Sequence, residues 1–393
     1  MKPTLALTLA AWSSALLVHT GAQTQLALPG APLAGLTPVE FSEFRLGLED
    51  FTEVEAAEEG LGPAFNGTSC AVCHNLPAIG GAGVILELRA GYREDNGTAR
   101  GLNPAHDTLI HMLSIPNHGC QPQMPDDVNV IARRAPIPLF GAGLVEAIPD
   151  DTLLGLEDPF DRNRDGVSGR AGMVTDLATG AQRVGRFGWK AQHATLLAFG
   201  ADAYRNEMGI TNDLFPVESA FGVSDSQMRV CDPFPDPEDR RDPRTGRRGI
   251  DNFESFMRLL GPIPRSHADE ITREGERVFA AIGCATCHVP ALETGASANP
   301  LFHRKRVELF SDLLLHEVGT GDGIRQAAAE AAEIRTPALW GLRHRRPLLH
   351  DGSAATIADA ILRHGGEAAR ARAGYGRLGD DERAALLRFL NTL

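Results

Sequence analysis

The sequence predicts a mainly α-helical protein built from two related halves. A pentapeptide of the form Cys-x-x-Cys-His occurs twice, at residues 70–74 and 284–288. A segment with apolar residues at helical spacing precedes each copy, and a third such segment closes the chain. Strand signals are weak throughout, with one candidate hairpin at residues 84–92. These observations predict two helical domains, the first of which carries long loop insertions.

The first 22 residues predict an export signal. Lys2 is followed by an apolar stretch over residues 5–18, and the small residues Thr20 and Ala22 suit cleavage after Ala22. The apolar stretch is too short to span a membrane, and no later segment is long enough. We therefore expect an exported, periplasmic protein without a membrane span.

The first domain should begin with a loose arm over residues 23–36, which is rich in Leu, Ala, Pro and Gly. A helix is predicted to follow, with Thr37 as its cap, Pro38 at its first position and Glu40 completing a capping box. Its apolar face is predicted to consist of Phe41, Phe44, Leu48 and Phe51.

The second half repeats this order. Ser266 is the predicted cap of a helix shortly before the second pentapeptide, and its predicted apolar face consists of Ile271, Gly275, Val278 and Phe279. A closing helix is predicted over residues 380–393. Between the halves, residues 232–249 are dense in Pro, Asp and Arg, which indicates an exposed loop.

The repeated pentapeptide indicates covalent attachment of two haem c groups. In each copy the two thiols bond to the haem vinyl groups and the following histidine binds the iron. A zinc site would more often pair two Cys-x-x-Cys units at short spacing, and a redox dithiol would not be followed twice by His. The predicted haem-binding residues are Cys70, Cys73, His74, Cys284, Cys287 and His288.

Two cysteines, Cys120 and Cys231, remain after haem attachment. In an oxidising compartment they are expected to form a disulfide, with two buried free thiols as the alternative. The formal net charge of −13 argues against nucleic acid and anionic membranes as partners. This charge is compatible with a small redox protein as electron donor or acceptor.

The two halves also contain similar segments outside the pentapeptides. Residues 134–141 (Arg-Ala-Pro-Ile-Pro-Leu-Phe-Gly) loosely match residues 335–341 (Arg-Thr-Pro-Ala-Leu-Trp-Gly), and residues 194–196 resemble residues 355–357. This suggests duplication of a haem domain. The order of helix, haem motif, loops and closing helix resembles a cytochrome c fold. We therefore expect two cytochrome c-like haem domains, residues 23–257 with the insertions and residues 258–393, after a signal peptide at residues 1–22.

Further sequence blocks resemble the di-haem oxidoreductase family, also labelled thiol oxidoreductase. This family is related to bacterial dihaem cytochrome c peroxidases and to MauG enzymes. The resemblance covers nearly the whole mature chain. The blocks that carry it lie at residues 62–66, 185–191, 207–211, 314–316, 350–352 and 364–368.

The resemblance implies an axial ligand for the C-terminal haem. In the related peroxidases this ligand follows a His-Asp-Gly block, and the corresponding residue here is His364, where those enzymes have Met. His364 would give an iron with two histidine ligands. His316 and His350 are competing candidates, and a surface position for His364 is the structural alternative.

The resemblance also implies a reaction site at the N-terminal haem. The related peroxidases have a Trp between their haems and a Glu over the peroxidatic iron, and Trp189 and Glu207 match that order. Such a carboxylate can move a proton between the oxygens of H₂O₂. The alternatives are core packing for Trp189 and a surface charge for Glu207. The Gln often found before this Glu is not evident, since Phe199 lies near its place.

Further residues are candidates for the remaining haem contacts. Three histidines could instead fill the sixth site of the N-terminal iron: His106, His111 and His118. Arg offers a fixed fork of donors, so three arginines are candidates for pairing with haem propionates: Arg186, Arg335 and Arg343.

A calcium site is a further candidate. Asp161, Asn163 and Asp165 alternate before a turn glycine, which suits Ca²⁺. Position 12 of the loop is Gly172, so this is not an EF-hand, although a remote carboxylate such as Asp176 could complete the site. The related peroxidases carry calcium between their domains, and a plain Asx turn is the alternative.

Together these features predict an exported dihaem c-type oxidoreductase with peroxidase-like activity. H₂O₂ would be reduced at the N-terminal haem, with electrons entering through the C-terminal haem. The alternatives are a pure electron-transfer cytochrome, and a MauG-like or oxygenase-like enzyme that oxidises a macromolecule.

Overall fold

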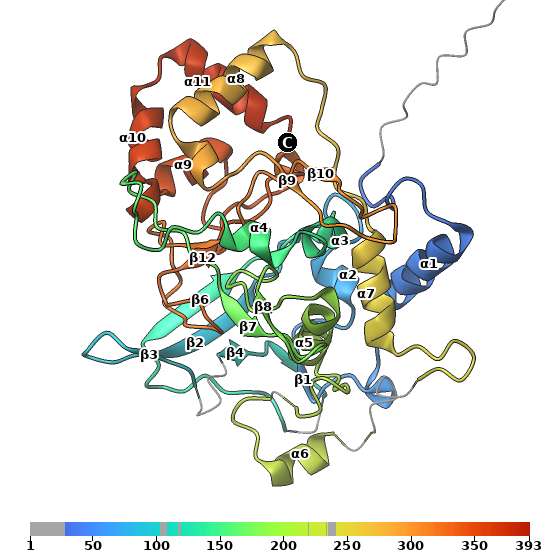
Figure 1. The fold of residues 1–393 in the computed structure, drawn as a ribbon. Coiled ribbons are helices and arrows are strands. Elements are labelled where there is room, and N and C mark those ends of the chain that lie inside the picture. The colour runs from blue at the N-terminus through green and yellow to red at the C-terminus, as the bar shows by residue number, and fades with distance from the viewer. Residues whose placement is uncertain (1–27, 103–107, 117–118, 219, 233, 235–240) are drawn as a thin grey trace, which may run out of the picture.

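The computed structural model describes residues 28–393, except 103–107, 117–118, 219, 233 and 235–240 (Figure 1). The predicted signal peptide, residues 1–22, lies outside the described residues, and export stays a prediction. Within the described part of the chain, no helix is long and apolar enough to cross a membrane.

The fold is a mixed one that is rich in helix, with 31% helix and 13% strand. The helices are α1 (Pro38–Thr52), α2 (Cys70–Cys73), α3 (Ala142–Glu146), α4 (Asp150–Leu154), α5 (Leu196–Met208), α6 (Asp225–Cys231), α7 (Gly249–Leu259), α8 (Glu270–Ala281), α9 (Ile357–Arg363), α10 (Ala369–Arg377) and α11 (Asp380–Leu390). The strands are β1 (Ala64–Phe65), β2 (Glu87–Arg93), β3 (Ala99–Arg100), β4 (Leu109–Ile110), β5 (Leu113–Ser114), β6 (Val130–Arg134), β7 (Met173–Thr175), β8 (Gln182–Val184), β9 (Leu292–Glu293), β10 (Arg306–Val307), β11 (Leu315–His316) and β12 (Ile334–Arg335).

The strand content corrects the expectation of a mainly α fold. The candidate hairpin at residues 84–92 is in fact β2, which pairs antiparallel with β3, β4 and β6. The side chain of Leu88 therefore has Ile110 on one neighbouring strand and Arg133 on the other. The sequence pattern could not reveal this sheet, because several partner strands are only two residues long and show no readable alternation.

In the first half, α1 packs along α7, and Figure 1 shows the two helices side by side. The start of α1 confirms the prediction, since Thr37 and Glu40 form a capping box and Pro38 opens the helix. The two helices approach closely at Gly47, where an added Cβ would lie 2.2 Å from the Asn252 carbonyl oxygen. The predicted apolar face was wrong at one position, since Phe41 is half exposed.

In the second half, α8 packs against α11, and these helices form the top of the view in Figure 1. The cap of α8 is Asp269 rather than the predicted Ser266, because the Asp269 carboxylate accepts the Thr272 N–H at 2.8 Å. The Ser266 N–H instead donates to the Thr392 carbonyl oxygen. The helices meet at Gly275, whose added Cβ would lie 2.0 Å from the Ala385 carbonyl oxygen. The predicted apolar face of α8 was wrong at Ile271, which is half exposed.

Two apolar cores hold these helices. The smaller core is drawn from the C-terminal part of the chain, between Val278 and Leu393. The larger core contains residues on both sides of the predicted domain boundary at 257/258, among them Phe44, Tyr204 and Leu309. Residues after the boundary therefore pack directly on the N-terminal helices.

A disulfide joins Cys120 to Cys231, with the Cα atoms 5.9 Å apart. Both residues are buried. The bond ties the loop after β5 to the end of α6. The four motif cysteines are free of disulfides.

The close contact of α8 with α11 predicts that Gly275→Ala destabilises the protein. The new methyl group meets a carbonyl in a rigid helix, and overpacking of this kind costs about 1–3 kcal/mol. Gly376→Ala is the matched control, because nothing lies within 4 Å of its added Cβ. It should stabilise α10 by no more than about 1 kcal/mol. Chemical unfolding of the two holoproteins compares them, and equal stability of both variants would contradict the packing argument.

Candidate haem cavities and the tryptophan between them

Each Cys-x-x-Cys-His motif lines its own cavity. Cys70, Cys73 and His74 line the first, whose space free of protein atoms is about 1210 Å³. The second has about 1810 Å³ of such space, part of it open to solvent. The motif residues that line it are Cys284, Cys287 and His288.

The two motif histidines are held in the same way. His74 donates its Nδ1–H to the Gly81 carbonyl oxygen at 2.9 Å, and His288 donates to the Phe310 carbonyl oxygen at 3.1 Å. A carbonyl can only accept, so Nε2 of each ring keeps a free lone pair for a metal.

The electrostatics of the motif histidines suit iron binding as well. Burial lowers the pKa of His74, and it lowers the pKa of His288 to about 4. Both rings are therefore neutral at physiological pH. With two thiols beside each ring and a cavity in front of it, the donor set at both sites fits a haem c.

Two related helices contribute the other key residue of each cavity. α5 begins after Thr195 and α9 begins after Thr356, and in both cases the Thr side chain caps the helix. These caps belong to the matching segments 194–196 and 355–357. Near their C-terminal ends, α5 brings Glu207 into the first cavity and α9 brings His364 into the second.

His364 has the arrangement of an available ligand. Its Nδ1–H donates to the Ala360 carbonyl oxygen at 2.7 Å, so Nε2 is free, and burial lowers its pKa. His364 lines the same cavity as His288, and its proximity helps to lower the pKa of His288. A surface position for His364 is therefore wrong, whereas iron ligation stays a prediction.

Of the two competing candidates for this ligand, His316 is held by other groups, whereas His350 lines the second cavity. Both ring nitrogens of His316 hydrogen-bond to carboxylates, Nε2 to Asp312 and Nδ1 to Glu367, each at 2.8 Å. Burial opposes charge on this ring, but the two carboxylates raise its pKa to about 12. His316 is thus a buried imidazolium and not a free ligand. His350 packs edge-on against Trp189, with the ring centroids 6.0 Å apart.

Glu207 is a partly buried acid that lines the first cavity. Its carboxyl accepts a hydrogen bond from Asn66 Nδ2 at 2.7 Å and shares another with Glu87. Burial, followed by the charge of Glu87, raises the pKa of Glu207 to about 8. Burial would also raise the pKa of Glu87, but Arg89 and Arg134 hold it below its ordinary value. Glu207 is therefore the protonated member of the pair at neutral pH, and the surface-charge alternative is wrong.

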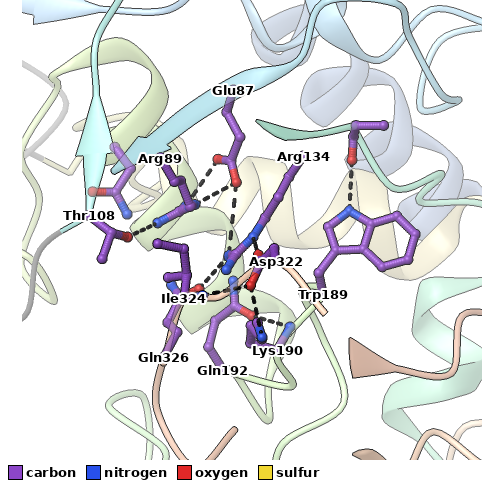
Figure 2. A network of polar contacts seen from close by, with 12 residues as sticks. Glu87, Arg89, Thr108, Arg134, Trp189, Lys190, Gln192, Asp322, Ile324 and Gln326 are labelled. Carbon is purple, nitrogen blue, oxygen red and sulfur yellow. Dashed lines mark hydrogen bonds and ion pairs between the residues drawn. The ribbon is translucent and has the colours of Figure 1, made fainter. Parts of the chain in front are cut away.

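A network of buried charges stands behind this pair (Figure 2). Glu87 is bound by Arg89 at 2.6 Å and lies 4.0 Å from Arg134. Arg134 donates from Nε to Asp322 at 2.7 Å, and Asp322 also binds the fully buried Lys190 at 3.1 Å. Since Asp322 belongs to the C-terminal half, residues from both halves hold the acid pair. Sequence reasoning missed the whole network, because its members are distant in the chain.

Trp189 lines both cavities. Its indole N–H donates to the Ala135 carbonyl oxygen at 2.8 Å, as Figure 2 shows, and its own carbonyl oxygen accepts the Arg335 N–H at 2.8 Å. Ala135 and Arg335 belong to the two matching segments 134–141 and 335–341. The duplicated segments thus meet on one tryptophan that forms a wall of each cavity.

Two of the three arginines predicted to meet haem propionates have other roles. Arg186 is fully buried and donates to the carbonyl oxygens of Val184 and Ile148 and to the Asp150 carboxylate. Arg343 donates to backbone carbonyl oxygens near the C-terminus. Both predictions are wrong, since these guanidinium groups already donate to backbone carbonyl oxygens and, for Arg186, to a carboxylate.

The second cavity contains the third predicted arginine and one that was missed. Arg335 lines this cavity, its guanidinium donates to the carbonyl oxygens of Gly188 and Thr336, and pairing with a propionate stays a prediction. Arg345 also lines it, with its guanidinium 5.0 Å from the centroid of the Trp189 ring. The sequence could not single out Arg345 as the arginine that lines the cavity, because Arg343 and Arg346 lie beside it in the chain.

The candidates for the sixth site of the N-terminal iron fall into two groups. His106 and His118 lie outside the described residues. His111 is buried but does not line the first cavity, and its Nε2 bonds to the Asn206 carbonyl oxygen at 2.7 Å. Of the residues that line this cavity in the described structure, His74 is the one histidine. Gln192 also lines it, a residue that sequence reasoning did not single out.

In the predicted calcium loop, the side-chain oxygens meet the backbone of the loop itself. Asp161, Asn163 and Asp165 each accept a hydrogen bond from a loop N–H, at 2.9–3.2 Å. Asp176 does not complete the loop, because its carboxylate accepts the Thr179 and Thr195 hydroxyls at 2.6 Å. This geometry is that of Asx turns, and calcium binding stays a prediction.

Comparison with solved structures finds weak similarity to several haem proteins. Hydrazine synthase of Kuenenia stuttgartiensis is 15% identical, with all of both chains covered and a TM-score of 0.42. The diheme peroxidase BthA of Burkholderia thailandensis is 16% identical, with 93% of this chain and 94% of that chain covered and a TM-score of 0.43. A MauG-like protein associated with microbial copper homeostasis is 18% identical, with 71% and 94% covered and a TM-score of 0.33.

A search among curated proteins gave no match. Among protein families, the one described as "Di-haem oxidoreductase, putative peroxidase" matches residues 114–393. The match includes Trp189, Glu207 and the second pentapeptide, whereas the first pentapeptide precedes it. It covers most of the sequence and implies two haems. The chain belongs to the di-haem oxidoreductase family.

Proposed function

We propose that this protein is a peroxidase that reduces H₂O₂ to water in the first cavity. The proposal is supported above all by the placement of Glu207. A partly buried acid with a pKa of about 8 occupies the position that a histidine occupies in the second cavity. An acid of this pKa can both accept and return a proton near neutral pH.

The cofactor of the first cavity would be attached to Cys70 and Cys73, with His74 as its protein ligand. When bound, it supplies an iron at which peroxide can be reduced. Glu207, in its ionised form, takes a proton from the near oxygen of H₂O₂ and returns it to the far oxygen as the O–O bond breaks. Asn66 orients the carboxyl, and Glu87 sets its affinity for the proton. The overall reaction consumes two electrons and two protons and forms two molecules of water.

The electrons would come from a small redox protein and enter at the second cavity. Cys284, Cys287 and His288 would hold the cofactor there, and His364 would supply a second nitrogen ligand. Such a ligand set would suit this site for electron transfer rather than for binding peroxide. Trp189 lies on the path because it forms a wall of both cavities. Export to the periplasm, predicted from residues 1–22, would place the enzyme where such donors meet peroxide.

The role of Glu207 predicts that Glu207→Gln lowers peroxide turnover by about 10²–10⁴-fold, the usual contribution of a positioned acid–base group. The measurement is steady-state oxidation of a reduced small cytochrome by H₂O₂. Glu254→Gln is the control, because Glu254 is also a mostly buried acid but lies outside both cavities. Unchanged turnover in Glu207→Gln would reject the proposed role. Absence of turnover in the wild type would instead favour a pure electron-transfer protein.

The raised pKa of Glu207 predicts a pH dependence. Only the ionised form accepts a proton, so kcat/KM for H₂O₂ should rise about tenfold per pH unit below about 8 and level off above it. Glu87→Gln removes the neighbouring negative charge, which lowers the pKa of Glu207. The rise should then move to lower pH. A flat profile between pH 5 and pH 9, or a shift to higher pH, would contradict this assignment.

The role of His364 predicts that His364→Ala converts the second haem from low spin to high spin. The loss of one of two nitrogen ligands weakens the ligand field at the iron. Low-temperature EPR of the oxidised holoprotein reports this directly. His303→Ala is a suitable control, since His303 is exposed and does not line the second cavity. A low-spin signal that persists in His364→Ala would reject the ligand assignment.

A further inference from the structure

Arg345 is a buried cation that lacks an acidic partner among the described residues. Its side chain is one of the most deeply placed charges of the second cavity, with only 7% of the residue exposed. Its Nε and Nη2 atoms have no hydrogen-bond partner in the described structure. Burial lowers its pKa to about 10, so the group still carries its charge at neutral pH. A buried charge without a counter-ion is strongly unfavourable, which indicates that an anion belongs beside it.

The protein groups around Arg345 do not supply that anion. The positive charge of Arg345 acts on Arg335, whose pKa is lowered by burial and by this neighbour. The negative charge of Asp312 favours the charged form of Arg335, but the Asp312 carboxylate is already hydrogen-bonded to the His316 ring. On its other side, Arg345 faces the apolar ring of Trp189. Two neighbouring cations thus line the cavity wall, and the acid that acts on Arg335 is already bound by His316.

The cavity itself indicates which anion fits. It is the cavity of the second haem-attachment motif, and a haem carries two propionate carboxylates. A guanidinium with two adjacent free donors binds a carboxylate through a pair of parallel hydrogen bonds. Arg370 and Arg372 line the same cavity but are exposed, so solvent already satisfies their charges. Among these arginines, Arg345 is therefore the one whose burial requires a partner.

We propose that Arg345 binds a propionate of the haem in the second cavity, beside the ring of Trp189. The propionate contact rests on the two haems of the family. Its consequence for electron transfer rests on the proposed function, because Trp189 is the proposed route to the first cavity. Arg345 is thus a positioning residue, which acts on the reaction through the cofactor and the tryptophan.

The test compares three holoproteins with the wild type: Arg345→Gln, Arg345→Lys and Arg346→Gln. Arg346→Gln is the matched control, because Arg346 is the next residue, is exposed and donates to backbone carbonyl oxygens of its own turn. Resonance Raman spectroscopy reports the propionate-bending bands, and spectroelectrochemistry reports both haem midpoint potentials. Neither measurement uses peroxide, so failure of the proposed peroxidase function would leave the result intact.

In Arg345→Gln we expect one propionate-bending band to shift and the midpoint potential of the second haem to fall, because a positive charge that favours the reduced state is lost. Arg345→Lys should shift the same band, since the paired contact is lost, but should keep the potential near that of the wild type. Arg346→Gln should leave the bands and potentials unchanged. Unchanged bands in both Arg345 variants would overturn the proposal. If Arg345→Gln does not fold, the band shift in Arg345→Lys decides the question alone.

Discussion

Two hydrogen bonds hold Trp189, and one of them joins the two halves of the molecule. One runs from its indole N–H to Ala135 and the other from the Arg335 N–H to its carbonyl oxygen, both at 2.8 Å. Ala135 and Arg335 come from matching segments of the two halves. Two similar segments thus both contact Trp189, which lines both cavities. Because Trp189 belongs to the first half and Arg335 to the second, separating the halves would break a buried hydrogen bond.

The two cavities share a plan but differ in electrostatics. In each, a histidine on the attachment motif donates to a carbonyl, and a Thr-capped helix brings in one further residue. The first cavity receives an acid whose proton affinity is set by Glu87 and the arginines behind it. The second receives a neutral histidine and is rich in arginine instead. This shared plan is compatible with proton transfer at one site and electron transfer at the other, because the charges that line the two cavities differ.

The sequence predicted what is local and missed what depends on distant partners. The cap at Thr37 and Glu40 lies within four residues, and the attachment motifs are continuous, so both were readable. Trp189 and Glu207 were found through family resemblance rather than through their environment. Glu87 and Arg345 were missed, because burial and missing partners create their roles, and neither is visible along the chain. Arg186 was misjudged for the same reason, since its partners are backbone carbonyl oxygens some forty residues away.

The larger core bears on how the protein unfolds. It combines Phe44 and Tyr204 with Leu309 and Trp340, from the other side of the boundary at 257/258. A cut at that boundary would expose apolar surface on both fragments and remove Asp322 from Arg134 and Lys190. The halves are therefore not independent folding units. Heating should therefore unfold the large core in one cooperative transition, although the sequence contains two similar halves.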